Sequence, residues 1–143
     1  MCRPHFKRDI SMVEKVVVPI PGLSEGMKAA RIPISPVVRA NGFLFLSGMP
    51  PLDLQTGTVV QGADLPTQTR LCLEGIKHVL THAGSTLDKV VSMKVYCTEP
   101  EHFDVVNDVY RTFFQHDPPS RTFIPVSSWK MGFDIEIECV ALE

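Results

Sequence analysis

Three side chains in this sequence combine reactive chemistry with an apolar setting. Arg121 opens an otherwise apolar segment, Glu136 interrupts an alternating apolar run, and Asn107 lies at helical spacing among aromatic residues. A guanidinium is a planar group with five donors, and it matches a carboxylate through two parallel bonds. Glu136 and Glu138 share one face of a strand that should be largely buried, which is costly unless they are paired or functional. These residues favour a site that binds a small carboxylate.

Each of the three also has a purely structural explanation. Arg121 can be an exposed residue at the start of a strand. Glu136 can belong to an outward polar face, and Asn107 can make a hydrogen bond between a helix and the sheet. The residue types alone leave both explanations open. They predict no more than a small oligomeric α+β protein with a carboxylate-binding arginine.

Metal, redox and nucleotide motifs are weak or missing. His78 and His82 are four residues apart, but the glutamate of an H-E-x-x-H motif is missing and no third ligand is evident. None of the four cysteines stands in a C-x-x-C pair, so we expect buried, reduced thiols. The sequence has no phosphate loop, dinucleotide fingerprint or G-x-S-x-G elbow. We therefore expect neither a metal nor an organic cofactor.

Composition places the chain among ordinary globular proteins. It has 143 residues, of which 44% are hydrophobic and 21% charged, and this length fits one compact domain. The 14 basic residues are scattered among 16 acidic ones, with a net charge of −2, which argues against nucleic acid as the main partner. No apolar run reaches the roughly 20 residues that cross a bilayer, and the basic start lacks the apolar stretch of a signal peptide. We expect a cytoplasmic protein with no membrane partner.

The hydrophobic pattern predicts strands, a helix, a strand, a second helix and further strands. Residues 1–11 are polar and aperiodic, so we expect a tail there and a single domain over 12–143. The Asn41-Gly42 pair predicts a tight hairpin. The other expected elements are a strand at 16–18, a mostly irregular stretch at 23–36, a short strand near 59–60, a helix from the N-cap Asp64 to the C′ residue Gly84, a strand at 90–97, a second helix that a capping box at 98–101 opens, and strands at 121–126 and 133–142.

The last predicted strand carries apolar residues on both of its faces. With a period of two, Phe133 and Ile135 share one face, while Val140 and Leu142 share the other with the two glutamates. Two amphipathic helices can cover only one face of such a sheet, so the second face must be buried elsewhere. The simplest partner is another copy of the chain. We therefore expect a mixed sheet with two helices on one face, in a homo-oligomer.

Six short segments, in their order and spacing, resemble the Rid (YjgF) family over about residues 12–143. The ordered set is more specific than any one segment. The segments lie at 43–48, 68–69, 83–84, 106–110, 119–122 and 135–141.

The resemblance implies a chorismate-mutase-like α+β fold and a homotrimer with active clefts between adjacent subunits. Members of this family hydrolyse 2-imino acids, such as 2-iminopropanoate or 2-iminobutanoate, to 2-oxo acids and ammonia, and they need no cofactor. In the family pattern Arg121 matches the arginine that binds the substrate carboxylate. Glu136 matches the glutamate that holds or activates water, and Asn107 and Ser47 match residues that line the cleft.

Two positions depart from the best-studied branch of that family. Val37 stands in the place of a tyrosine, and Phe123 in the place of a cysteine two residues past the arginine. We expect both positions to contact substrate in a pocket that is larger or more apolar in its lining. The change keeps open a pathway-specific enamine deaminase, acting on aminoacrylate or aminomuconate, and a non-catalytic oligomer that only holds small carboxylates. Ribonuclease activity, also attached to the family name, is disfavoured by the acidic balance.

Overall fold

A six-stranded mixed sheet organises the molecule in this computed structural model, which describes residues 14–143. The tail predicted at 1–11 lies outside the described residues. Along the sheet the strands follow the order β1-β2-β3-β8-β6-β7, and β4 and β5 form a separate pair. Only β6 and β7 run parallel within the large sheet; its other neighbours are antiparallel. The strands are β1 (Val16–Val18), β2 (Val37–Ala40), β3 (Phe43–Leu46), β4 (Leu52–Asp53), β5 (Thr58–Val59), β6 (Val90–Cys97), β7 (Ser120–Pro125) and β8 (Ile135–Leu142); the helices are α1 (Leu23–Ala29), α2 (Leu65–His82) and α3 (Phe103–Phe113).

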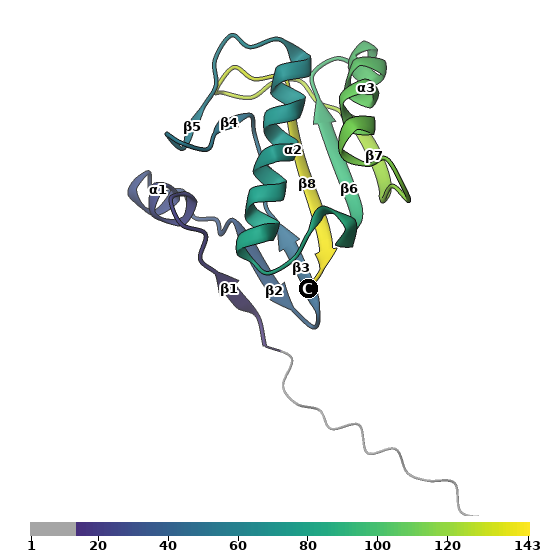
Figure 1. Ribbon diagram of the computed structural model, residues 1–143. Helices are drawn as coiled ribbons and strands as arrows, with labels where there is room; N and C mark the ends of the chain where they lie inside the picture. Colours follow the sequence, from purple (N-terminus) through teal and green to yellow (C-terminus); the bar gives the residue numbers. More distant parts are fainter. Residues whose placement is uncertain (1–13) are drawn as a thin grey trace, which may run out of the picture.

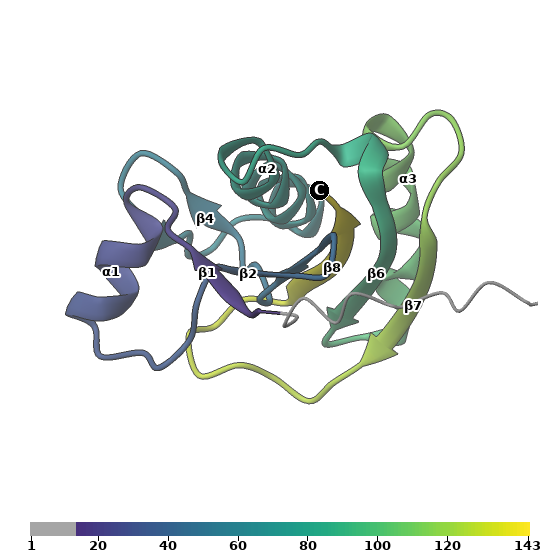
Figure 2. The same ribbon diagram turned by 90° about the horizontal axis from the view of Figure 1, so that it is seen from below.

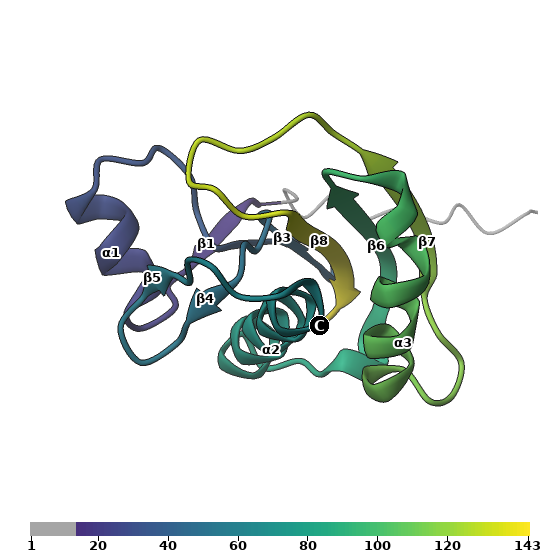
Figure 3. The same cartoon turned by 90° about the horizontal axis from the view of Figure 1, so that it is seen from above.

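Two helices cover one face of the sheet, as predicted. Figure 1 shows α2 and α3 side by side in front of the strands, and Figures 2 and 3 show that both stay on the same side. The core lies between these helices and the alternate residues of β8 and β6 that face them, such as Ile135, Ile137 and Val95, all fully buried. This arrangement is the α+β fold that we expected. Within residues 14–143, no helix has the length and apolar character that crossing a membrane requires.

The predicted start and end of α2 are confirmed. The carboxylate of Asp64 accepts a hydrogen bond from the backbone N–H of Thr67 at 2.9 Å, and Pro66 occupies the first turn, where a missing N–H costs nothing. Gly84 follows the helix with φ of +83°, a conformation that favours glycine. The hairpin is confirmed as well, because Ala40 pairs with Phe43 across the Asn41-Gly42 turn.

Two predictions about local structure are wrong. The stretch 23–36 contains the short helix α1, whose start is stabilised by the carboxylate of Glu25, which accepts from the N–H of Gly22 at 2.7 Å. The capping box at 98–101 does not form. A separate 3-10 turn at Pro100–His102 precedes α3, and the hydroxyl of Thr98 donates to Asp134 instead.

The face of the sheet opposite the helices carries an apolar row. The strand registers align Val17, Val38, Phe45 and Val140 across β1, β2, β3 and β8. Phe45 is 46% exposed and Val17 is 50% exposed, so one chain leaves much of this row in water. We call these four residues the open-face row. Such an exposed apolar patch is typical of a protein–protein interface.

Candidate active site

Arg121 is held by three groups of α3. Its Nη2 donates to Oδ1 of Asn107 at 2.6 Å. Its guanidinium carbon lies 4.6 Å from the ring centre of Tyr110 and 5.6 Å from that of Phe103, distances at which an aromatic face attracts a cation. These contacts use one of the five N–H donors, so the others remain able to bind a carboxylate.

Phe123 completes this cluster on the edge strand β7. Arg121 and Phe123 are opposite the buried Met93 and Val95 of β6, so both side chains point to the helix side of the sheet. The ring of Phe123 meets that of Phe103 edge-on, with centres 5.4 Å apart. The structure therefore brings Arg121, Asn107 and Phe123 together in one cluster.

Burial gives the cluster a partly desolvated character. It raises the pKa of Tyr110 to about 12, although the positive charge of Arg121 acts in the opposite direction. Tyr110 is therefore neutral at physiological pH and presents its ring to the guanidinium. An arginine that is restrained in this way loses little conformational entropy when it binds a ligand.

Glu136 lies on the opposite face of the sheet, over a bulge between β3 and β8. Phe45 pairs with Val140 and Met49 with Ile137, so the Ser47-Gly48 side carries one extra residue. A side chain at position 48 would overlap the carboxylate of Glu136, so glycine is needed for this close approach. Burial, and then the charge of Glu138, raise the pKa of Glu136. A raised pKa brings a carboxylate nearer to the range that suits a general base or acid at neutral pH.

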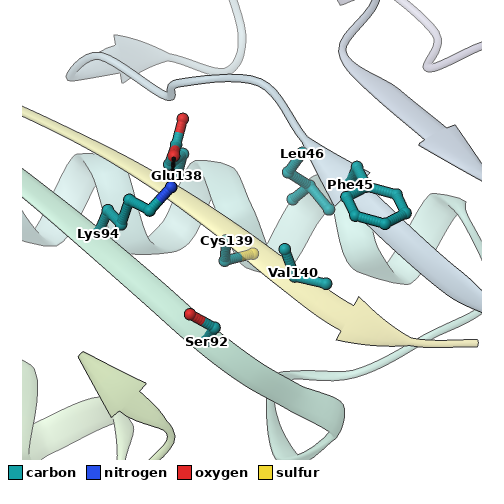
Figure 4. A pocket seen from close by; sticks show the side chains of 7 residues that line it. All are labelled: Phe45, Leu46, Ser92, Lys94, Glu138, Cys139 and Val140. Carbon is teal, nitrogen blue, oxygen red and sulfur yellow. Dashed lines mark hydrogen bonds and ion pairs between the residues drawn. The ribbon is translucent and has the colours of Figure 1, made fainter. Parts of the chain in front are cut away.

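Glu138 differs from Glu136 because it is paired. It accepts from Nζ of Lys94 at 3.0 Å and from Oη of Tyr96 at 3.1 Å. Figure 4 shows Lys94 reaching toward Glu138 on the open face, where a hollow of about 370 Å³ lies between β3, β8 and β6. The Lys94 ammonium compensates the charge of Glu138, which leaves Glu136 as the carboxylate able to act on a ligand.

Arg121 and Glu136 cannot meet within one chain. Arg121 contacts α3 on the helix side, whereas Glu136 is the cross-strand partner of Tyr96 on the open face. The sheet separates the two side chains. A site that contains both needs two copies of the chain, and Arg121 is well placed for this because β7 is an edge strand.

The comparisons with known proteins agree with this fold. A family described as Endoribonuclease L-PSP matches residues 27–143, most of the chain. A solved structure from Yersinia pestis, of a protein of unknown function in the conserved Rid family, is 33% identical with a TM-score of 0.80; the match covers 91% of this chain and all of that one. The chain belongs to the Rid family. 

Two other Rid-like proteins have informative names. The 3-aminoacrylate deaminase RutC of Acinetobacter baylyi is 34% identical over 83% of this chain and 94% of its own length. The structure of E. coli TdcF with bound serine is 32% identical with a TM-score of 0.71, covering 78% of this chain and 88% of that chain. The family thus includes at least one protein named as a deaminase and one solved with a bound amino acid.

Two residues that the Rid resemblance placed in the cleft behave differently in the structure. Ser47 lies in the bulge beside Gly48, and its hydroxyl donates to the carbonyl of Ser35 at 2.7 Å, so it also holds the start of the hairpin. The assignment of Val37 to the pocket is wrong for this chain. Val37 pairs with Leu46 on the helix side and is 0% exposed, so it packs in the core and cannot line an open cleft.

Two features of this Rid protein were not predicted. The close approach of Gly48 to Glu136 depends on a bulge that local sequence does not reveal. The buried side chain of Gln68 accepts from the N–H of Asp134 at 2.8 Å and donates to the Asp134 carboxylate at 2.9 Å. This contact joins the start of α2 to the start of β8, and so steadies the strand that carries Glu136.

The histidine pair belongs neither to the Arg121 cluster nor to the surroundings of Glu136. The rings of His78 and His82 on α2 lie at an angle of 46°, with centres 4.2 Å apart, and Nδ1 of His82 contacts the carbonyl of His78 at 2.9 Å. Among residues 14–143, no three His, Cys, Asp or Glu side chains gather as a metal site would require.

We expect activity to survive metal removal. Dialysis against EDTA should leave the rate of deamination unchanged, because neither the Arg121 cluster nor Glu136 has metal-ligand geometry. Metal analysis of the purified protein accompanies the rate measurement. A loss of activity that added zinc restores would make His78 and His82 candidate ligands again.

Proposed function

We propose that this protein hydrolyses 2-imino acids, or the enamines in equilibrium with them, to 2-oxo acids and ammonia. The observation that carries the proposal is the restrained guanidinium of Arg121, which keeps free donors on a partly buried edge strand. Such a group binds a carboxylate in a defined orientation. The Rid relative named as a 3-aminoacrylate deaminase supports the same class of reaction.

The proposed site lies between subunits. Arg121 of one copy binds the substrate carboxylate, and Glu136 of the next copy lies beside the carbon–nitrogen double bond. The sheet supports this arrangement, because it holds the two side chains on opposite faces of a single chain. It also accounts for the open-face row, which a second copy would cover. A closed ring of three copies is the assembly that we propose.

The reaction needs water and proton transfers, and all of its atoms balance. Glu136 takes a proton from water as the oxygen attacks the carbon of the protonated imine, and the C=N electron pair becomes the lone pair of the amine nitrogen. Glu136 then gives that proton to the amine nitrogen of the carbinolamine. The C–N bond breaks, ammonia leaves, and the hydroxyl group loses its proton to water as the carbonyl forms. Arg121 holds the carboxylate throughout and so orients the carbon toward the water. An imine is already electrophilic, so an electron sink is not required for this step.

A closely related substrate class is an enamine such as 3-aminoacrylate, which the Acinetobacter baylyi relative is named for. Protonation on carbon converts an enamine into an iminium, which water then attacks in the same way. The raised pKa of Glu136 suits a carboxyl that both gives and takes protons. RNA cleavage is not part of the proposal, because the net charge is −2 and basic residues are scattered.

A coupled assay tests the proposal. An amino-acid oxidase generates 2-imino acids from a panel of amino acids, and the rate of 2-oxo acid formation is compared with and without this protein. The uncatalysed hydrolysis is fast, so it must be subtracted. Acceleration supports a deaminase. Binding of pyruvate or 2-oxobutanoate without any acceleration would instead indicate a protein that only holds small carboxylates.

The assembly makes a separate prediction. Light scattering at micromolar concentration should give three times the chain mass of 15.9 kDa. Phe45→Asp should dissociate the assembly, because it places a charge in the open-face row. Val105→Asp is the matched control, since Val105 is also an exposed apolar residue but lies on α3. A monomeric mass for the unmodified protein would contradict both the trimer and the site between subunits.

A further inference from the structure

A second hollow on the open face borders Glu136. It has a volume of about 290 Å³ and lies where β6 and β7 end and β8 begins. Figures 2 and 3 show that the segment between β7 and β8 passes the end of β6. Three residues of this segment line the hollow. Its lining is Tyr96, Val126, Ser128, Trp129, Glu136 and Glu138.

The lining of this hollow combines apolar groups that are held in place with Ser128 and two carboxylates. The indole of Trp129 stacks on the ring of Phe133, with centres 4.8 Å apart and planes at 28°. Phe133 is 2% exposed, so the indole rests on the core. Tyr96 is oriented by the hydrogen bond that it donates to Glu138. Two aromatic rings and Val126 therefore form a surface suited to an apolar group.

In the proposed reaction each carboxylate beside the hollow already has a cationic partner. Glu138 already has Lys94 as its cationic partner at 3.0 Å. Glu136 remains, and in the proposed reaction it faces the imine nitrogen, which is positive when protonated. A second cation on the substrate side chain would find no unpaired carboxylate there. An apolar or aromatic side chain would instead gain contact with the rings and leave water.

We propose that this hollow is the side-chain subsite of the enzyme, and that it selects 2-imino acids with bulky apolar or aromatic side chains. Trp129 is the residue that determines this specificity. The inference rests on the proposed function, because it takes Glu136 as the group beside the reacting carbon. The size of the hollow is close to the lower limit for ligand pockets, about 300 Å³, which is ample for a phenyl or isobutyl group.

The test compares two imines in one assay. For each protein, kcat/KM is measured with the imine of phenylalanine and with the imine of alanine, and the ratio of the two is calculated. The unmodified protein should prefer the phenylalanine imine. Trp129→Ala should lower the ratio by about 10-fold to 100-fold, the usual range for loss of apolar contacts in a pocket. Trp129→Phe should keep most of the ratio, because it retains an aromatic wall.

A second variant guards against misfolding, since Trp129 rests on the core. Ser128 is exposed and lies at the rim of the hollow, so Ser128→Phe should fill the space without disturbing packing. It should lower the ratio, mainly by raising KM for the phenylalanine imine. Ser127→Phe is the matched control, because Ser127 is an exposed neighbour outside the lining. That control should keep the unmodified ratio.

The outcomes separate the inference from the function on which it rests. Hydrolysis with the same ratio in unmodified, Trp129→Ala and Ser128→Phe proteins would overturn the subsite and leave the deaminase standing. A preference for the arginine imine over the phenylalanine imine would overturn the apolar assignment. If no imine is hydrolysed above background, both proposals fall together.

Discussion

Arg121→Ala should remove both imine hydrolysis and the binding of 2-oxo acids. The guanidinium is the group that we expect to grip the substrate carboxylate, and loss of a desolvated charge pair costs about 2–5 kcal/mol, or roughly 30-fold to several-thousand-fold in affinity. Arg121→Lys should also lose most activity although it keeps the charge. An ammonium makes a point contact with a carboxylate, and it would not reproduce both the Asn107 bond and the two parallel bonds to substrate.

The fold should survive these changes, because Arg121 stands at the border of the sheet. Circular dichroism and the mass of the assembly are the checks. Arg111→Ala is the matched control, since Arg111 is an exposed arginine of α3 that pairs with Asp108. Folded Arg121→Ala protein with full activity would remove the main observation that supports the deaminase proposal. A variant that unfolds or dissociates would make Arg121 a structural residue.

Glu136→Gln should lower kcat by roughly 100-fold or more while binding of pyruvate changes little. The substitution keeps the shape over Gly48 but removes the base. Glu101→Gln, an exposed change on the turn before α3, is the control and should be silent. Equal turnover in Glu136→Gln would show that the carboxylate is structural.

The same residue sets the expected dependence on pH. Burial and Glu138 raise the pKa of Glu136 above its usual value of 4.5. The basic form is therefore lost as the pH falls through that raised pKa, and the catalysed rate should decline on the acid side before an ordinary glutamate would protonate. Glu138→Gln removes the neighbouring charge and should move this decline to lower pH. An unchanged acid limb would exclude Glu136 as the titrating group.

Long periodic elements were predictable because their signals are local. The cap at Asp64, the apolar stripe and Gly84 define α2 without knowledge of the rest of the chain. The helix α1 was missed because it is short, holds Gly26 and lies among prolines, so its pattern resembles a loop. The capping box failed because Thr98 has a distant competitor, Asp134, which sequence alone does not place beside it.

In the candidate site too, local features could be predicted and long-range contacts could not. The helical spacing of Asn107 among aromatic residues was enough to put it on a buried face, and its partner proved to be Arg121. The position of Val37 was also within reach, since a two-residue turn pairs it with Leu46 and so with the core side. The approach of Gly48 to Glu136 could not be predicted, because it depends on a bulge between strands far apart in the sequence. Trp129 gave no signal, since a lone aromatic in a polar loop has many explanations.

The separation of Arg121 and Glu136 by the sheet has a genetic consequence. If each cleft takes one side chain from each of two subunits, then Arg121→Ala and Glu136→Gln damage different halves of it. A cell that makes both inactive proteins would assemble mixed rings, and in about a quarter of the clefts an intact arginine would face an intact glutamate. Two recessive defects in one gene would then complement each other, which is impossible for a site built within a single chain.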